Sequence, residues 1–313
     1  FYLKQRYYFY YRMNSTKTLK SFAILILIRA SWGSSYLLMK KSLLHLNPYQ
    51  LASARMFVAC WCFLPIALFY VRKLDRKNIK YLLIVGFFGS GIPSFCFAIA
   101  QTNMNSSLTG TLSSLTPIFT LLLGMLFFKL QPSFIKIFGI CIGLCGAAMI
   151  MLSKTDLHGI QNAWYGWFVV LATILYAWST NTIGKYLKNV NSIEISAVAF
   201  SLMVIPASIL FYTTGAFDLA VSHEVPISVF YPVITLAILG SVITSIAYFY
   251  LINISGSLFA STVSYLTPVV AILLGLYDGE KLFLIQYLGI LVLLSGIVFT
   301  RFDIKKSVQR TTN

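Results

Sequence analysis

The tripeptide Leu-Thr-Pro occurs twice in this chain, 151 residues apart, and both copies lie inside long apolar stretches. Proline removes a hydrogen bond from a helix and bends it, so a proline in the middle of an apolar helix needs a structural reason. Other residues recur at a spacing of 151 or 150: Gly89-Ser90 as Gly240-Ser241, Gly124 as Gly275, Gly139 as Gly289, and Gly146 as Gly296. The sequence therefore predicts a fold built from two related halves.

Composition places both halves in a membrane. The 313 residues are 58% hydrophobic and 10% charged, with a mean hydropathy of +0.81, whereas soluble domains are about 45–50% apolar and about 25% charged. About 20 apolar residues cross the roughly 30 Å hydrocarbon core, so the chain has room for about ten transmembrane helices. The five cysteines all fall in these apolar stretches and are interpreted as small buried side chains, with no metal and no cofactor expected.

Apolar runs between polar breaks give the expected spans. The ranges are 20–42, 50–71, 80–101, 106–128, 134–152, 164–185, 193–213, 228–252, 257–277 and 283–300. With the N-terminus inside, 18 of the 24 lysines and arginines lie in cytoplasmic segments, so the positive-inside rule places both termini in the cytoplasm. Because each half has five spans, an odd number, the second half enters the membrane in the opposite orientation, as an inverted repeat.

The expected organisation has four parts. A cytoplasmic tail, 1–19, begins with twelve residues that precede Met13 and are interpreted as non-native. The two repeats cover 20–153 and 162–301, and 302–313 form a second cytoplasmic tail.

Several motifs resemble the drug/metabolite transporter superfamily, and within it the EamA-like family of ten-helix carriers. These are Trp32-Gly33-Ser34-Ser35, the two Leu-Thr-Pro copies, Gly279-Glu280-Lys281 and the recurring glycines. The resemblance implies that helices 1–4 and 6–9 surround a central cavity, with helices 5 and 10 outside them. It also implies alternating access and, commonly, export of amino acids or other small metabolites. One departure is that Lys129 occupies the position equivalent to Glu280, where the family usually carries an acid.

Two arginines are candidates for binding a substrate anion. Arg29 lies near the centre of the first span, and Arg55 lies closer to the external end of the second. An arginine in a membrane costs about 2.5–3.5 kcal/mol on insertion scales and usually faces a cavity or a partner. The alternative for each is that its side chain reaches the membrane surface or makes a structural hydrogen bond.

Three prolines are candidate hinges: Pro93, Pro117 and Pro268. Each frees a backbone carbonyl, which is tolerated in a membrane beside a cavity or a compensating hydroxyl. The nearby hydroxyl side chains are therefore candidate substrate ligands: Ser113, Thr116, Ser264 and Thr267. The alternative is that the prolines only kink helices that must curve.

Five aromatic residues near the centre of their spans are candidate cavity walls: Trp32, Tyr176, Trp178, Tyr248 and Tyr265. The alternative is ordinary packing or contact with lipid. Glu280 is a candidate gating or coupling residue near the outer mouth, and the alternative is an interfacial residue paired with Lys281 or Lys154.

The sequence thus predicts a secondary transporter in the bacterial cytoplasmic membrane, an exporter of small metabolites such as amino acids. A channel or a non-transporting protein is an alternative, and so is an external hydrolase using Asp156, His158, His223 and Glu224, although these lack a metal-ligand spacing. Nucleic acid is not an expected partner, because membrane topology accounts for the net charge of +16. The Gly139-x-x-x-Gly143 motif is interpreted as helix packing within one chain, with a homodimer seam as the alternative.

Overall fold

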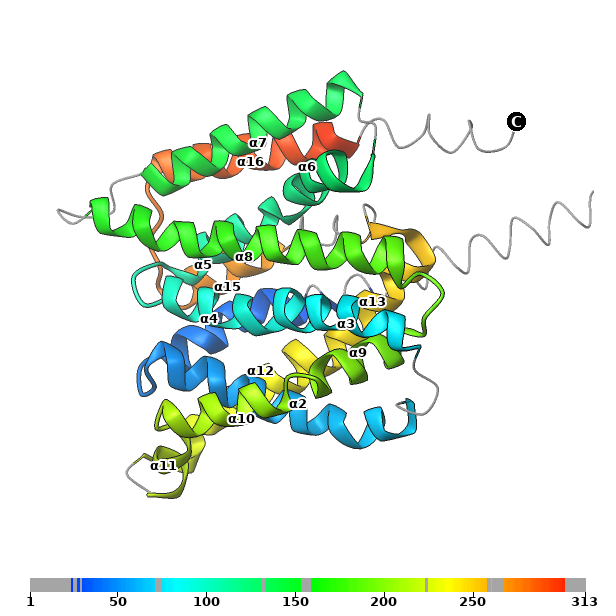
Figure 1. Ribbon diagram of the computed structural model, residues 1–313. Coiled ribbons are helices and arrows are strands. Elements are labelled where there is room, and N and C mark those ends of the chain that lie inside the picture. Colours follow the sequence, from blue (N-terminus) through cyan, green and yellow to red (C-terminus); the bar gives the residue numbers. More distant parts are fainter. Residues whose placement is uncertain are drawn as a thin grey trace, which may run out of the picture.

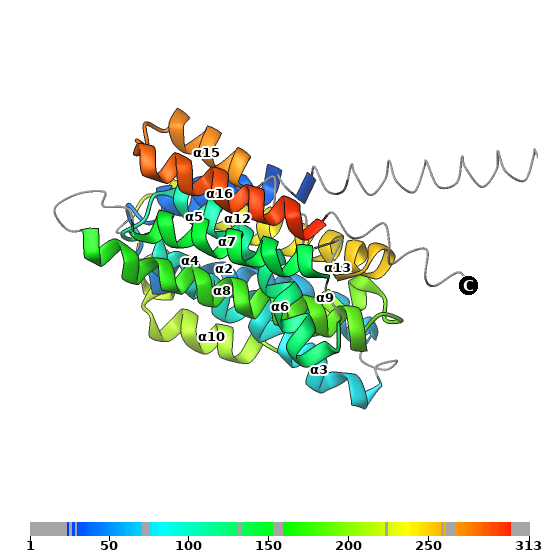
Figure 2. The ribbon, with the colours of Figure 1, turned by 90° about the horizontal axis from the view of Figure 1, so that it is seen from above.

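The computed structural model describes residues 24, 27–28, 30–70, 75–130, 133–152, 159–222, 225–257, 260 and 267–301. In these ranges every regular element is helical. The long helices run roughly along one direction, seen from the side in Figure 1 and from above in Figure 2.

The first half contains helical residues 30–42 and four further helical stretches. These are α2 (Pro48–Tyr70); η2 (Arg76–Asn78), α3 (Ile79–Gly86), η3 (Phe87–Gly91) and α4 (Ile92–Ala100) in series; α5 (Ser106–Leu112), η4 (Ser113–Leu115) and α6 (Thr116–Phe128) in series; and α7 (Phe134–Leu152).

The second half repeats this plan. Its elements are α8 (Gly159–Tyr186); α9 (Ser192–Ser201), α10 (Val204–Thr213) and α11 (Ala216–Val221); η5 (Ile227–Val229), α12 (Phe230–Ala237), η6 (Ile238–Ile243) and α13 (Thr244–Ser255) in series; α15 (Thr267–Tyr277); and α16 (Leu284–Arg301).

Four helical stretches within the described ranges are long and apolar enough to cross a membrane: Pro48–Tyr70, Arg76–Ala100, Ser106–Phe128 and Ile227–Ile254. The pair α9 and α10 makes a fifth if it is one span with a 45° bend. The chain is therefore a multi-pass membrane protein, while ten spans with both termini inside stay a prediction.

The bend between α9 and α10 interrupts the one helix expected over 193–213. Leu202 and Met203 separate the two helices, and Pro206 lies in the first turn of α10. Proline has no N–H, and its ring clashes with the carbonyl four residues earlier, here that of Leu202, so the helix breaks at this point.

The two halves interlock rather than forming separate lobes. Helix α15 packs on α5, α9 packs on α2, and α8 contacts both α4 and α6. Outside this group α16 lies along α7, as both views show.

Recurring glycines allow the close approach of α7 and α16. A Cβ atom on Gly146 would lie 2.6 Å from the Leu293 Cα, and one on Gly296 would lie 2.6 Å from the Gly143 Cα. Real side chains do not tolerate such distances, so the backbones meet at these two glycines. The small-residue face of α7 is thus covered by α16 of the same chain.

The duplicated Gly-Ser pairs each lie in a π-helical turn. Gly89 and Ser90 belong to η3, and Gly240 and Ser241 belong to η6, at the equivalent place in the second half. A π-turn contains an extra residue and is often found at a functional site. The sequence predicts the duplication but not this backbone form.

Candidate substrate cavity

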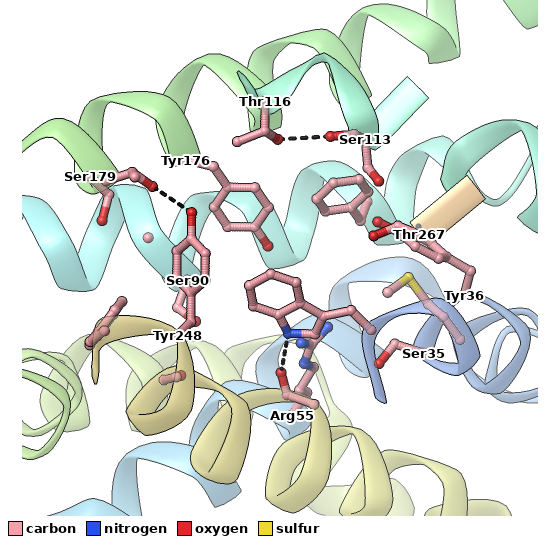
Figure 3. A pocket seen from close by; sticks show the side chains of 18 residues that line it. Ser35, Tyr36, Arg55, Ser90, Ser113, Thr116, Tyr176, Ser179, Tyr248 and Thr267 are labelled. Atoms are coloured by element: carbon pink, nitrogen blue, oxygen red, sulfur yellow. Dashed lines mark hydrogen bonds between the residues drawn. The ribbon is translucent and has the colours of Figure 1, made fainter. Parts of the chain in front are cut away.

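A cavity with a free volume of about 80 Å³ lies between the two halves. Both halves contribute side chains to its wall, from helical residues 30–42 and from α2, η3, η4, α8, α13 and α15 among others, as Figure 3 shows. The described lining residues are Trp32, Ser35, Tyr36, Met39, Arg55, Gly89, Ser90, Phe97, Ser113, Thr116, Tyr176, Ser179, Thr180, Gly240, Ser245, Tyr248, Phe249 and Thr267. The wall therefore combines aromatic rings and hydroxyl groups with a single charged side chain.

That charged side chain is Arg55, which α2 directs into the cavity. Its Nε–H donates to the Ser241 hydroxyl at 3.0 Å, so a residue of the first half is fixed by the π-turn of the second. Gly240 borders the guanidinium, since a Cβ atom at this position would lie 3.7 Å from the Arg55 Nη2, at ordinary van der Waals contact.

An indole ring forms part of the same wall. The Trp32 Nε1–H donates to the Gly240 carbonyl at 3.2 Å and to the Thr244 hydroxyl at 3.1 Å. Its ring centroid lies 5.1 Å from that of Tyr248, whose hydroxyl is 3.2 Å from the Thr180 hydroxyl. These contacts hold aromatic rings of both halves against one another.

The break at Pro117 also lies at the cavity. A proline at this position leaves the Ser113 carbonyl without its usual amide donor. The Thr116 hydroxyl donates to that carbonyl at 2.8 Å, and both Ser113 and Thr116 line the cavity. The Thr116 backbone N–H donates to the same carbonyl, so the amide and the hydroxyl of Thr116 together satisfy the backbone at the proline break.

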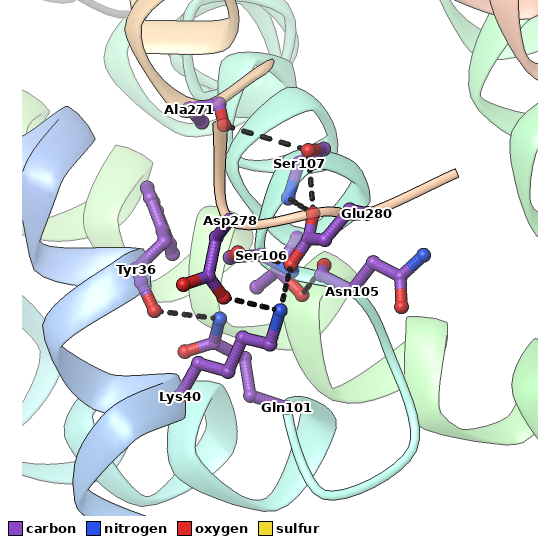
Figure 4. A network of polar contacts seen from close by, with 10 residues as sticks. Tyr36, Lys40, Gln101, Asn105, Ser106, Ser107, Ala271, Asp278 and Glu280 are labelled. Carbon is purple, nitrogen blue, oxygen red and sulfur yellow. Dashed lines mark hydrogen bonds and ion pairs between the residues drawn. The ribbon is translucent and has the colours of Figure 1, made fainter. Parts of the chain in front are cut away.

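At the end of the bundle predicted to face outside, Glu280 joins the two halves (Figure 4). Its carboxylate accepts hydrogen bonds from the Ser106 amide at 2.9 Å and the Ser107 amide at 3.0 Å. The hydroxyls of Ser106 and Ser107 also donate to it. Lys40 lies 3.0 Å from this carboxylate and 2.7 Å from that of Asp278. The loop after α15 is thereby fastened to the start of α5 and to the first helix.

These contacts determine the ionisation of Glu280. Burial raises the pKa of its carboxyl group, but the hydrogen bonds from Ser106, Ser107 and Lys40 outweigh burial and lower the pKa to about 2. Glu280 is therefore ionised at neutral pH, although its side chain is only 2% exposed.

The equivalent place in the first half carries no acid. The sequence offset pairs Glu280 with Lys129, but Lys129 ends α6 with a left-handed backbone (φ 61°). A Cβ on Gly124 would meet the Leu130 side chain, just as one on Gly275 would meet the Glu280 carboxylate. Where the second half has a buried carboxylate beside Gly275, the first half thus has an exposed apolar side chain beside Gly124.

A family model for EamA-like transporters matches the chain in two stretches, residues 19–152 and 163–302. The chain belongs to the EamA-like transporter family. The two matched stretches show the two-repeat architecture of that family, and the chain is accordingly a membrane transporter.

Curated relatives that match along most of their own length are described as transporters. The uncharacterized transporter YdfC of Bacillus subtilis (strain 168) is 25% identical over 281 residues, covering 88% of this chain and 89% of the relative. The uncharacterized inner membrane transporter YedA of Escherichia coli (strain K12) is 26% identical over 291 residues, covering 91% and 92%. A solved crystal structure superposes with a TM-score of 0.58 at 14% identity, covering 92% of this chain and 98% of that one, which shows a shared fold.

The structure brings seven of the ten substrate-site candidates to this cavity: Trp32, Arg55, Ser113, Thr116, Tyr176, Tyr248 and Thr267. Arg29 and Ser264 lie outside the described residues, and so does the aromatic candidate Tyr265. Trp178 is not among the described lining residues; its ring packs 5.0 Å from that of Phe127.

The candidate hinges and gate are placed as follows. Pro93 and Pro117 lie in the first turns of α4 and α6, directly after the non-α turns η3 and η4, and Pro268 lies in the first turn of α15. Glu280 pairs with Lys40 rather than with Lys281, which makes no ion pair in the described part of the chain. Lys154 lies outside the described residues.

Sequence reasoning missed several lining residues, and helical spacing could have found some of them. Residues three and four positions apart share a helix face, so Tyr176 predicts Ser179 and Thr180 as neighbours and excludes Trp178. By the same spacing, Trp32 predicts that Tyr36, four residues later, also lines the cavity.

Proposed function

We propose that the protein is a secondary transporter that exports a small metabolite, such as an amino acid or a related compound, by alternating access through this cavity. The observation that carries the proposal is the joint construction of the cavity, with Arg55 of the first half held by Ser241 of the second. A site shared between two repeats changes its exposure when one repeat moves against the other.

The closure at the two ends supports the same mechanism. Ionic and hydrogen-bonded contacts fasten Glu280 to Ser106 and Lys40 at one end, and such contacts can separate and re-form without unfolding a helix. In the first half the Leu130 side chain, next to Lys129, contacts Gly124 as Glu280 contacts Gly275, so the two ends open against different forces. The non-α turns η3, η4 and η6 beside the cavity supply pliable backbone for this movement.

Counterflow in proteoliposomes tests the proposal. Vesicles containing purified protein and preloaded with an unlabelled amino acid mixture should accumulate labelled leucine transiently and saturably, whereas protein-free vesicles should not. A channel would equilibrate leucine without saturation or overshoot, and a non-transporting protein or an enzyme would match the empty vesicles. Export is tested separately, by faster efflux from cells that express the protein than from cells that do not.

A further inference from the structure

We infer that the cavity selects a small organic compound carrying a single carboxylate, which the Arg55 guanidinium binds, over neutral and cationic analogues of the same shape. The inference names the substrate class of the transporter proposed above and rests on that function.

The first argument is the charge of the cavity wall. Arg55 is the one charged side chain among the described lining residues, and no aspartate or glutamate accompanies it. Ion pairs in the described ranges involve Lys40 and not Arg55. The ionisable groups that act on Arg55 electrostatically are the phenols of Tyr176 and Tyr36, which are uncharged at neutral pH. Among the described residues Arg55 is therefore a buried cation without an anion, a costly arrangement that an anionic ligand relieves.

The second argument is the geometry of the guanidinium. An arginine has five N–H donors in a planar fork. The acceptor for Arg55 among the described side chains is Ser241, which takes the Nε–H and leaves the donors on Nη1 and Nη2 for a ligand. Because Arg55 lines the cavity, a ligand inside it can approach these donors. A carboxylate matches two such donors with two parallel hydrogen bonds.

The third argument is the total charge after binding. A single carboxylate neutralises Arg55, so the occupied cavity carries no net charge among its described residues. A phosphate dianion, a dicarboxylate or an amine would leave a net charge inside the membrane, where it is disfavoured. An amino acid presents the same carboxylate, and aromatic rings such as Trp32 and Tyr248 can face its ammonium group, so it ranks after the simple carboxylate.

The cavity wall also indicates the body of the compound. Away from Arg55, rings from both halves, such as Phe97 and Tyr248, form the wall together with serine and threonine hydroxyls. These surfaces suit a compact apolar or aromatic group, and the free volume of about 80 Å³ limits its size in this conformation.

Calorimetric titration of the purified full chain in detergent at pH 7.5 tests the inference with matched probes. One series is benzoate, benzamide and benzylamine; the other is 4-methylpentanoate, 4-methylpentanamide and leucine. Each carboxylate is expected to bind at least about tenfold more tightly than its amide, with leucine in between, because only the ion binds Arg55 through charge-assisted hydrogen bonds. Benzylamine is expected to bind most weakly in its series.

Variants identify the residue responsible. Arg55→Gln should reduce carboxylate affinity to that of the amide, and Arg55→Lys should keep part of the preference because the charge remains. Trp178→Phe, outside the described cavity wall, is the control and should behave as wild type. If Arg55→Gln does not fold, the comparison of wild type with Arg55→Lys still decides.

Equal affinity for carboxylates and amides, tighter binding of benzylamine, an unchanged preference in Arg55→Gln, or no binding of either carboxylate would overturn the inference. Counterflow separates it from the proposed function. If the order of binding holds without saturable counterflow, the transport proposal fails and the binding site stands. If neutral compounds exchange as well as carboxylates, transport stands and the carboxylate site is wrong.

Discussion

Replacing Glu280 with glutamine should destabilise the protein substantially at neutral pH. Hydrogen bonds and Lys40 hold the pKa of this carboxyl at about 2, against an ordinary value of 4.5. That difference corresponds to about 3 kcal/mol of stability supplied by the ionised group. Glutamine keeps the shape but loses the charge, and its amide N–H₂ faces donors from Ser106 and Ser107 instead of accepting from them.

Thermal unfolding of detergent-purified protein, followed by intrinsic fluorescence, measures the effect. At about 2 °C per kcal/mol for a chain of this length, Glu280→Gln should lower the midpoint by about 6 °C at pH 7. Asp278→Asn is the matched control, since it removes the other partner of Lys40 from a site that is 26% exposed. An exposed ion pair contributes about 1 kcal/mol or less, so this control should shift the midpoint by about 2 °C at most.

The pH dependence gives a second check. Because folding lowers the pKa of Glu280, its contribution is complete above pH 4.5 and is lost as the pH falls toward 2. The difference between wild type and Glu280→Gln should therefore shrink over this interval. Equal shifts for the two variants at pH 7, or a difference that stays constant down to the lowest accessible pH, would refute the assignment of a buried, stabilising carboxylate.

Three other predictions follow from packing, the cavity and topology. Gly146→Leu should greatly lower the yield of folded protein on size-exclusion chromatography, because its Cβ would meet the Leu293 backbone. The control Leu291→Val, at a site 65% exposed, should leave the yield unchanged. Equal yields of the two variants would contradict the described packing of α7 on α16. Trp32→Phe loses two hydrogen bonds and should raise the KM for counterflow about tenfold. The control Trp178→Phe should leave the KM unchanged. A KM unaffected by Trp32→Phe would argue against the indole as part of the site. In a cysteine-free background, an impermeant maleimide should label Lys281→Cys in intact cells and Lys188→Cys only after permeabilisation, and the reverse result would invert the predicted orientation.

The sequence was informative for features that depend on residues close together in the chain, such as the bounds of helices and the repeated motifs. The apolar runs predicted the bounds of some helices closely, as the range 134–152 and α7 (Phe134–Leu152) illustrate. The duplicated Leu-Thr-Pro and Gly-Ser motifs indicated two related halves, and the family match shows that architecture. Hydrophobic burial and helix geometry are enough for such predictions.

The candidate site was harder, because it depends on contacts between residues far apart in the chain. Arg55 lies near the external end of its helix, so a side chain that reaches the membrane surface was an alternative. Its partner Ser241, 186 residues away in the chain, instead holds it in the cavity. The alternative for Glu280 was an ion pair with Lys281 or Lys154, whereas its partners Ser106 and Lys40 lie more than 170 residues earlier in the first half. No spacing rule within one helix contains this information.

The paired π-turns have a consequence for anyone who edits or aligns this sequence. Each adds about one residue to its helix, and one residue corresponds to about 100° of rotation. Deleting Gly89 or Gly240 would convert the turn into ordinary α-helix and swing every later side chain of that span to another face. Phe97, beyond the first π-turn, would then leave the cavity wall although its own codon was untouched. An insertion or deletion at either place thus rotates the rest of the helix about its axis. A gap there in an alignment indicates that different residues line the cavity, not that a loop has changed length.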